Sequence, residues 1–594
     1  MAVAELRARR DAVCRRVESL RQYVWRARAE RGFDEALEDV RLAEDEMRHA
    51  IIRDVSPEVR AQIELQLGDG GFARIEPSVH RVATDEPALC HIIGKLGEVS
   101  ARQLEADPFR EDEFRRYAPG DLVGVSGVEA CAETALRGGR GERLRDLDGR
   151  VLSQTDASDG QDVPLSIDVD LQVKIAALLT DAVAANPPST GAACVVLDVR
   201  TREVLALVSV PTFDPRTLAT DYRTLRDDAR ARPLLFRAVA EEYPPGSICK
   251  PLALLAGMAT GGIDPRQTVE CRGRLFDNVD AWFCWTQWRQ LPPHGTVDAI
   301  GAIQHSCNIY FYQLGQRVGG RRLTDFYRGV FQAARLGLPE ERDGNVPTEA
   351  ELIATRGHGF SPSDGRNFAL GQGEIQITPL QAANLFATIA AGELRAPTLI
   401  HNDPRPRPAL PLPGVRREHW DVLREGLFRC ANQPGGTAFE GARMDELVVC
   451  GKTGSAQCVP RVVEWEVTFG DDDGARHVVN AHTIESARER LNRRARERPV
   501  ARRAVARWPA LERAERGSMP THAWFAGFAP REDPRIAVAL VIEFGGSGGK
   551  VAAPVGRRVF ETLLDSPGGY LVQDAALPKA AHPRQPRNSP ADVE

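Results

Sequence analysis

Residues 243–256 read YPPGSICKPLALLA, and this stretch decides how the rest of the chain is interpreted. Residues before proline avoid the α region, so the two prolines keep the approach extended, and the following glycine permits a tight turn. A helix can then begin at Ser247. In that helix Ser247 and Lys250 share one face, which brings the lysine amine within reach of the hydroxyl. The stretch predicts either an ordinary serine helix cap or a nucleophile with its base one turn away.

The bulk properties of the chain are those of a globular protein. It has 594 residues, which is too long for one compact domain, so we expect two or three. Its formal net charge of −6 argues against a general nucleic-acid binder. The 11 cysteines are scattered and do not form the dense framework of a small secreted disulfide scaffold.

Neither a membrane anchor nor a signal peptide is evident in the sequence. No window contains the roughly 18 apolar residues that a membrane helix needs. The start of the chain, residues 1–32, is rich in arginine and lacks the apolar core of a secretory signal.

The chain divides by texture into three parts. Residues 1–160 begin with charged, helically patterned sequence and continue as a small mixed module. Residues 161–570 alternate helical and strand patterns, including a predicted helix after Leu165 and a predicted hairpin over 191–210. An insertion around 458–520 contains an Arg-rich helical pattern, and the Pro- and Ala-rich tail, 571–594, is typical of disorder. The fold class predicted is α+β.

Two further motifs could serve a serine nucleophile. Ser306-Cys307-Asn308 lies between apolar flanks, where two buried polar side chains need a reason. Lys452-Thr453-Gly454-Ser455 follows an apolar run, 447–450, that predicts a strand. A cation, a hydroxyl and exposed backbone N–H groups suit a substrate that carries a carboxylate. Each motif alone is often only a polar turn, but all three in this order rarely arise by chance.

The order S-x-x-K, S-x-N, K-T-G resembles the signature of penicillin-binding proteins and serine β-lactamases. Further stretches resemble the first group: GAACVVLDVRTREVLALVSVPTFDP (191–215), FALGQGEIQITPLQAANLFATIAAGE (368–393), HAWFAGFAP (522–530) and VAAPVGRRVFETLL (551–564). Upstream, RDVSPEVRAQIE (53–64) and GDLVGVSGVEACAETALRGGRGE (120–142) resemble the non-catalytic pedestal, or dimerisation-type, domain. The chain is therefore similar to class B, monofunctional penicillin-binding proteins of the elongation type. The resemblance implies a transpeptidase domain built of an antiparallel sheet flanked by helices, with a helical subdomain.

The resemblance also implies roles for the motif residues. Ser247 would attack the penultimate D-alanine carbonyl of a peptidoglycan stem peptide, and Lys250 would take its proton. Ser306 would relay a proton to the leaving amine, while Asn308 would orient the substrate amide. Lys452 would keep Lys250 neutral by its charge.

The rest of the third motif would bind substrate. Thr453 and Ser455 would bind the substrate carboxylate, with Gly454 between them. The backbone N–H groups of Ser247 and Ser455 would form an oxyanion hole, in which one donor is typically worth about 3 kcal/mol.

The function implied is that of a serine D,D-transpeptidase that cross-links stem peptides ending in D-Ala-D-Ala, releases D-Ala and is acylated by β-lactams. A D,D-carboxypeptidase, a β-lactamase or a β-lactam sensor is the alternative. No cofactor is needed for this chemistry. The resemblance implies a membrane glycosyltransferase of the elongation machinery as a partner and no nucleic acid. It also implies a place on the extracytoplasmic face of the bacterial inner membrane, so a missing anchor suggests a sequence truncated at its N-terminus.

A separate group of residues has the composition of a metal site. Cys271, Cys284, His294 and Cys307 supply three thiols and one imidazole within a short segment, which is a zinc-type ligand set. Their spacing is longer than in a zinc finger. The alternatives are a Cys271–Cys284 disulfide or unrelated buried thiols. If Ser306 and Asn308 face the substrate, Cys307 should point away, and a structural zinc ion there would hold the turn from behind.

Overall fold

The structure is a computed structural model that describes residues 2–34, 36–42, 55–67, 84–146, 150–458, 465–470, 476–481, 504–506 and 520–571. It divides into two compact units, Met1–Ala83 and Thr84–Glu594. Among the described residues, no helix combines the length and the apolar character that crossing a membrane requires.

The first unit is helical. It contains α1 (Ala2–Ala29), η1 (Leu37–Asp39) and α3 (Pro57–Leu67). The helical pattern predicted for the start of the chain is confirmed, and the single helix α1 accounts for 28 residues of it.

The second unit begins with a small mixed module. Its helical elements are η2 (Pro87–Leu89), α4 (Cys90–Ile93), α5 (Ala101–Glu105), α6 (Gly127–Cys131) and α7 (Glu133–Leu136). Two antiparallel hairpins accompany them: β1 (Leu96–Glu98) with β2 (Leu122–Gly124), and β3 (Glu142–Arg145) with β4 (Val151–Thr155).

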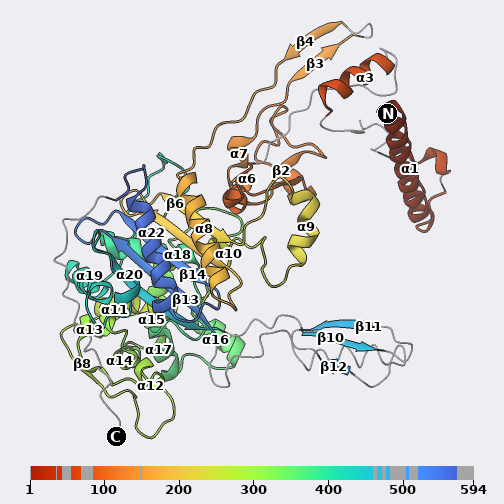
Figure 1. Ribbon diagram of the computed structural model, residues 1–594. Coiled ribbons are helices and arrows are strands. Elements are labelled where there is room, and N and C mark those ends of the chain that lie inside the picture. The colour runs from red at the N-terminus through yellow and green to blue at the C-terminus, as the bar shows by residue number, and fades with distance from the viewer. Residues whose placement is uncertain are drawn as a thin grey trace, which may run out of the picture. The chain divides into compact units, whose positions relative to one another are not determined.

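A five-stranded antiparallel sheet forms the centre of the second unit (Figure 1). Its strand order is β6 (Val204–Val210), β5 (Ala192–Asp198), β14 (Ile536–Ile542), β13 (Thr521–Ala529) and β9 (Cys450–Gln457). The hairpin predicted over 191–210 is therefore confirmed as β5 and β6. The pairs β5–β14 and β13–β9 join segments that are far apart in the sequence. Because β9 is the last strand in the order, the third motif lies on an edge strand.

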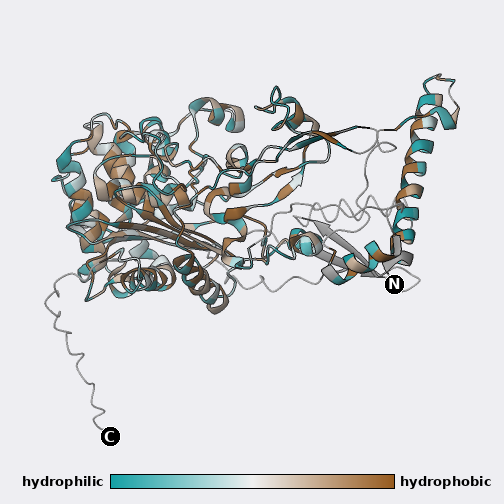
Figure 2. Ribbon diagram, turned by 90° about the horizontal axis from the view of Figure 1, so that it is seen from above, coloured by the Kyte–Doolittle hydropathy of each residue, from teal (hydrophilic) through white to brown (hydrophobic). Residues whose placement is uncertain are grey.

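Both faces of this sheet are covered, which explains why β5, β6 and β14 are apolar almost throughout rather than alternating (Figure 2). Along β5, Val195 belongs to the core on one face and Val196 to the core on the other. The helices α8 (Val169–Ala185) and α22 (Ala553–Leu564) cover one face, and α18 (Pro379–Ala391) covers the opposite face. The helix predicted after Leu165 is confirmed as α8.

A helical subdomain packs beside α18. Its main elements are α11 (Lys250–Ala259), α13 (Ala299–Gln304), α14 (Asn308–Val318), α15 (Gly320–Phe331), α16 (Glu349–Arg356), α17 (Pro362–Ala369) and α19 (Arg417–Asn432). Shorter elements are α9 (Leu218–Asp227), α10 (Arg237–Ala240), η3 (Gly246–Cys249), β7 (Val269–Cys271), α12 (Trp285–Trp288), β8 (Gly295–Val297), α20 (Phe439–Ala442) and η5 (Gly548–Ala552).

The predicted insertion contains a three-stranded antiparallel sheet of β10 (Trp465–Gly470), β11 (Arg476–Ala481) and β12 (Ala504–Ala506). The strand β12 falls within the Arg-rich stretch that was predicted to be helical, so that prediction is wrong for these three residues. Its alanine–valine–alanine sequence pairs with β10 instead. The rest of the Arg-rich stretch, and the tail after residue 571, lie outside the described residues.

Candidate active site

The first motif lies on a short 3-10 turn rather than on an α-helix. Ser247 is on η3, and the α-helix α11 begins only at Lys250. The approach to the turn is fixed by two contacts from distant segments. The indole Nε1 of Trp524 donates to the Pro244 carbonyl at 3.0 Å, and the Gly246 N–H donates to the Gly371 carbonyl at 2.9 Å. The turn is therefore held by the sheet on one side and by the segment before α18 on the other.

The amine of Lys250 is fully buried and joins the first two motifs. Its Nζ donates to the carbonyl of Ser306 at 2.8 Å, to the Ser306 Oγ at 3.1 Å and to the Oδ1 of Asn308 at 2.8 Å. Ser247 is half-buried, and within the described part of the chain its hydroxyl makes no hydrogen bond. Because hydrogen bonds to a catalytic base are often long without substrate, this arrangement is compatible with a serine–lysine pair.

The second motif is a strained turn between two helices. Ser306 has a φ of 53°, in the left-handed region that only a few per cent of non-glycine residues adopt. This conformation lets both its carbonyl and its hydroxyl face Lys250. Asn308 begins α14, and its Nδ2 donates to the Phe283 carbonyl at 3.1 Å, which fixes the amide with Oδ1 toward the lysine.

The third motif lies on β9, as the predicted strand implied, but this strand begins at Cys450 and leaves 447–449 outside it. Lys452 is fully buried and donates to the Thr453 carbonyl at 3.0 Å. Gly454 allows the turn of the first motif to approach: a Cβ there would lie 3.0 Å from the Pro245 oxygen. The Ser455 Oγ accepts from the N–H of Gly548 at 3.0 Å. All three motifs therefore meet in one place.

The electrostatics of this site favour a neutral Lys250. Burial is the larger cause and the nearby charge of Lys452 the second, and together they lower the pKa of Lys250 to about 7. Burial also lowers the pKa of Lys452. A lysine with a pKa near 7 can accept a proton at physiological pH, which an ordinary lysine cannot do.

Thr437 belongs to this site but was not found from the sequence. Its Oγ1 accepts a hydrogen bond from Thr453 Oγ1 at 2.8 Å and from Lys452 Nζ at 3.4 Å, and it lies 3.4 Å from the Sγ of Cys430. The only signal in the sequence is the turn-forming Gln-Pro-Gly-Gly before it. That turn is tied to α13, since the Thr437 N–H donates to the Gln304 carbonyl at 3.3 Å.

A buried ion pair behind the nucleophile was also missed. Glu543 directly follows β14 and is fully buried, and it accepts from the hydroxyls of Tyr243 at 2.9 Å and Thr190 at 2.6 Å. The guanidinium of Arg237, equally buried, lies 3.2 Å from the same carboxylate. A charged residue at the end of the apolar run IAVALVI was the available signal.

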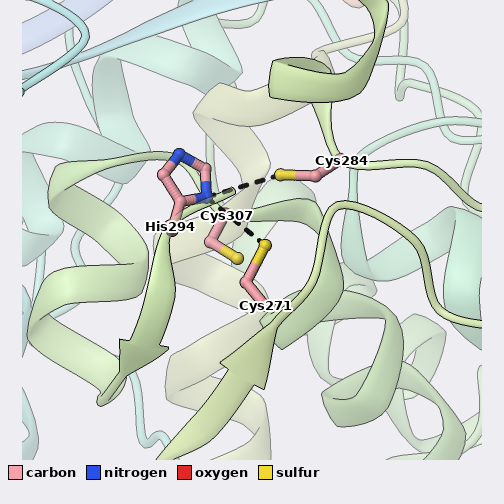
Figure 3. A group of neighbouring side chains, drawn as sticks. All are labelled: Cys271, Cys284, His294 and Cys307. Atoms are coloured by element: carbon pink, nitrogen blue, oxygen red, sulfur yellow. Dashed lines mark hydrogen bonds between the residues drawn. The ribbon is translucent and has the colours of Figure 1, made fainter. Parts of the chain in front are cut away.

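The predicted metal ligands come together in a second cluster (Figure 3). The ligand atoms of Cys271, Cys284, His294 and Cys307 all lie within 4.8 Å of one another, and the three cysteines are buried. The Nδ1 of His294 is 3.6 Å from the Cys271 Sγ and 3.5 Å from the Cys284 Sγ. All 11 cysteines are free thiols, so Cys271 and Cys284 form no disulfide here.

These distances fit a tetrahedral zinc ion. Zinc–sulfur bonds of about 2.3 Å and zinc–nitrogen bonds of about 2.0 Å place ligand atoms roughly 3.5 Å apart. Hydrogen bonds from the thiols of Cys271 and Cys307 lower the pKa of Cys284, which favours the thiolate that a metal requires. Cys307 points into this cluster while its neighbours Ser306 and Asn308 contact Lys250, so the two sites share one turn.

Two family profiles match the chain. The profile of the penicillin binding protein transpeptidase domain matches residues 192–504 and 511–561, which is more than half of the chain. The chain belongs to this family. The profile of the penicillin-binding protein dimerisation domain matches residues 7–165. The fold is thus the transpeptidase fold with an N-terminal pedestal domain, as the sequence predicted.

Curated relatives agree with the family. The chain is 28% identical over 500 residues to the peptidoglycan D,D-transpeptidase MrdA of Escherichia coli K12, covering 80% of this chain and 70% of the relative. It is also 28% identical over 515 residues to MrdA of Acinetobacter baumannii, covering 83% and 67%.

Solved structures show the same architecture. Pseudomonas aeruginosa PBP2, in complex with WCK 5153, matches with a TM-score of 0.59 and 27% identity over 81% of this chain and 90% of that one. Helicobacter pylori PBP2, in complex with MreC, matches with a TM-score of 0.62 and 22% identity over 82% and 78%, and supports the fold alone. A structure titled for the coordination of polymerization and crosslinking by a peptidoglycan synthase complex matches with a TM-score of 0.58 and 26% identity over 79% and 74%.

Proposed function

We propose that this protein is a serine D,D-transpeptidase that cross-links peptidoglycan stem peptides. The observation that carries the proposal is the buried Lys250, one turn after Ser247, with a lowered pKa and hydrogen bonds to Ser306 and Asn308. The names of the relatives support the same activity. Acylation by β-lactams follows from the same chemistry, because a strained lactam presents a carbonyl in place of the D-Ala-D-Ala peptide bond.

In the first half-reaction, Ser247 Oγ attacks the carbonyl of the penultimate D-alanine while its proton passes to neutral Lys250. The carbon–nitrogen bond then breaks and the terminal D-alanine leaves, its amine taking a proton through the Ser306 hydroxyl. In the second half-reaction, an amine of a neighbouring stem attacks the Ser247 ester. Ser247 regains its proton, and the two stems are joined by a new amide.

Substrate binding falls to the edge strand β9. Thr453 and Ser455 bind the terminal carboxylate of the donor, and Asn308 orients its amide. Gly454 keeps β9 close to the turn, so that the backbone N–H groups of Ser247 and Ser455 form the oxyanion hole. Burial and, second to it, the charge of Lys452 lower the pKa of Lys250 and so keep it deprotonated. The same charge of Lys452 attracts the carboxylate.

We infer that the cluster of Cys271, Cys284, His294 and Cys307 holds a structural zinc ion. Zinc would cross-link the turn of the second motif to the segment before it and take no part in the chemistry. The donor set of three thiols and one imidazole, and its spacing, support this assignment.

The pedestal and the fold suggest the setting of the activity. We propose a division near residue 160 between the pedestal and a transpeptidase domain that ends near 570. We propose that the protein works on the extracytoplasmic face of the inner membrane and pairs with a membrane glycosyltransferase of the elongation machinery. The titles of the related structures, one with MreC and one with a synthase complex, support that partnership.

The test is labelling with a fluorescent penicillin, with Ser247→Ala as the control. The wild type should take up label covalently and keep it for hours, while the variant should take up none. Loss of label within seconds would favour a β-lactamase, and no labelling of the wild type would refute the proposal. Formation of cross-linked product from lipid-linked glycan strands then separates a transpeptidase from a sensor or a carboxypeptidase.

A further inference from the structure

Arg366, on α17, has an unusual set of contacts for an arginine. Its Cζ lies 4.2 Å from the ring centre of Trp282 and 5.8 Å from that of Phe276. Within the described residues it makes no ion pair and donates no hydrogen bond, although its Nε is buried. Other arginines nearby are paired: Arg356, for example, lies 2.9 Å from the carboxylate of Asp364.

Arg366 is close to the second motif. The ring of Trp282 meets the ring of Tyr312 edge-on at 5.3 Å. The Tyr312 hydroxyl and the Asn308 Nδ2 both donate to the carbonyl of Phe283, at 3.4 and 3.1 Å. The rings of Trp282 and Tyr312 therefore separate the Arg366 guanidinium from the side-chain amide of Asn308, which contacts Lys250.

The backbone of Trp282, whose ring contacts the guanidinium, is strained. Trp282 has a φ of 63°, a conformation that bulky residues rarely adopt and that the surrounding contacts must maintain. Such strain concentrates at functional sites. Burial lowers the pKa of Arg366, and only the phenol of Tyr312 opposes this shift. Among the described residues, no carboxylate offsets this cost of burial.

A purely structural role would use only the flat faces of the guanidinium. Stacking on Trp282 anchors the loop through a cation–π contact worth about 0.5–1 kcal/mol at an exposed site. It leaves the N–H edge without a partner, and that edge is the part of arginine that recognises a carboxylate with two parallel hydrogen bonds. The geometry is that of a receptor for an anion that none of the described residues supplies.

We propose that Arg366 binds a side carboxylate of the donor stem peptide, upstream of its D-Ala-D-Ala end, and so selects among stem peptides. This inference rests on the proposed transpeptidase function. Stem peptides carry such carboxylates on D-glutamate and, where it is present, on diaminopimelate. Three extended residues span about 10 Å, so either group lies within a short peptide's length of the scissile bond.

The test is competition between synthetic pentapeptides and a fluorescent penicillin for the full-length protein. The reference peptide, L-Ala-D-isoglutamine-L-Lys-D-Ala-D-Ala, carries no side carboxylate. A second peptide restores the carboxylate on D-glutamate only, and a third carries it on diaminopimelate only. At least one anionic peptide should slow labelling of the wild type at about tenfold lower concentration than the reference, and the arm that does so identifies the source.

Two variants complete the test. Arg366→Gln should remove the preference for the anionic peptide, each variant's labelling without peptide serving as its own reference. Arg289→Gln is the matched control, because Arg289 lies 5.7 Å from the ring of Trp285 in the same segment and is exposed; it should keep the preference.

Several outcomes overturn the inference. They are equal competition by all three peptides, no competition by any of them while penicillin labelling is intact, or a preference that survives Arg366→Gln. These results leave the proposed transpeptidase standing. Failure of the wild type to label at all refutes the proposed function and this inference with it.

Discussion

Tyr243, four residues before Ser247, donates a 2.9 Å hydrogen bond from its hydroxyl to the buried carboxylate of Glu543. The same tyrosine exchanges two backbone hydrogen bonds with Ile377, and its ring meets Trp524 edge-on at 5.9 Å. The segment that leads into the turn of the nucleophile is thus fixed from three directions. A buried ion pair is weak evidence for stability but costly to break, because the remaining charge is left uncompensated.

Replacing Glu543 with glutamine should therefore destabilise the second unit. The change leaves the fully buried Arg237 without its counter-charge, and removing one partner of such a pair costs about 3–5 kcal/mol. Thermal or urea unfolding of the two proteins measures the loss. The control is Glu561→Gln, which breaks an exposed pair with Arg557 and should cost less than about 1 kcal/mol. Equal effects of the two changes would show that the buried pair is unimportant.

The rate of penicillin acylation should depend on the protonation of Lys250. Its pKa is lowered to about 7, so the neutral base is lost as the pH falls through that value. The rate should fall about tenfold per pH unit well below 7 and level off above it. Stopped-flow labelling at constant ionic strength measures this profile.

Lys452→Met tests the second cause of that shift. Removing the Lys452 charge should move the inflection to higher pH, although burial keeps the pKa of Lys250 below that of an ordinary lysine. Lys174→Met, an exposed lysine on α8, should leave the profile unchanged. A profile that is flat between pH 5 and 9 in the wild type would argue against Lys250 as the base.

The sequence was sufficient for the family, the hairpin of β5 and β6, the helix α8 and the three motifs, because each depends on local pattern or on short spacing. It was insufficient for residues that act through tertiary contact. Thr437 reads as part of a polar turn, and only the fold places it on Thr453. Ser247 was expected to begin an α-helix, whereas Gly246, with a φ of 55°, leads into a 3-10 turn and delays the α-helix to Lys250.

Removing the Thr437 hydroxyl should weaken substrate binding. Thr437→Val keeps the shape but leaves Thr453 and Lys452 without the acceptor that orients them, a loss of about 1 kcal/mol or roughly fivefold. The expected effect is on the dissociation constant of the non-covalent penicillin complex, measured from the concentration dependence of acylation. Thr437→Ser should restore it, since serine supplies the same oxygen. Equal constants for the valine variant and the wild type would refute the role.

Loss of one thiol should release the metal. Elemental analysis of the wild type should give about one zinc per chain, and Cys271→Ser should abolish it, because three ligands hold zinc far less tightly than four. Since zinc binds only the folded site, the unfolding temperature should fall when the zinc is lost. A chelator should lower the unfolding temperature of the wild type toward that of the variant. Cys131→Ser, an exposed thiol outside the cluster, should change neither quantity. The zinc proposal is refuted, in favour of a disulfide, if the wild type contains no metal and peptides mapped without reduction show Cys271 linked to Cys284.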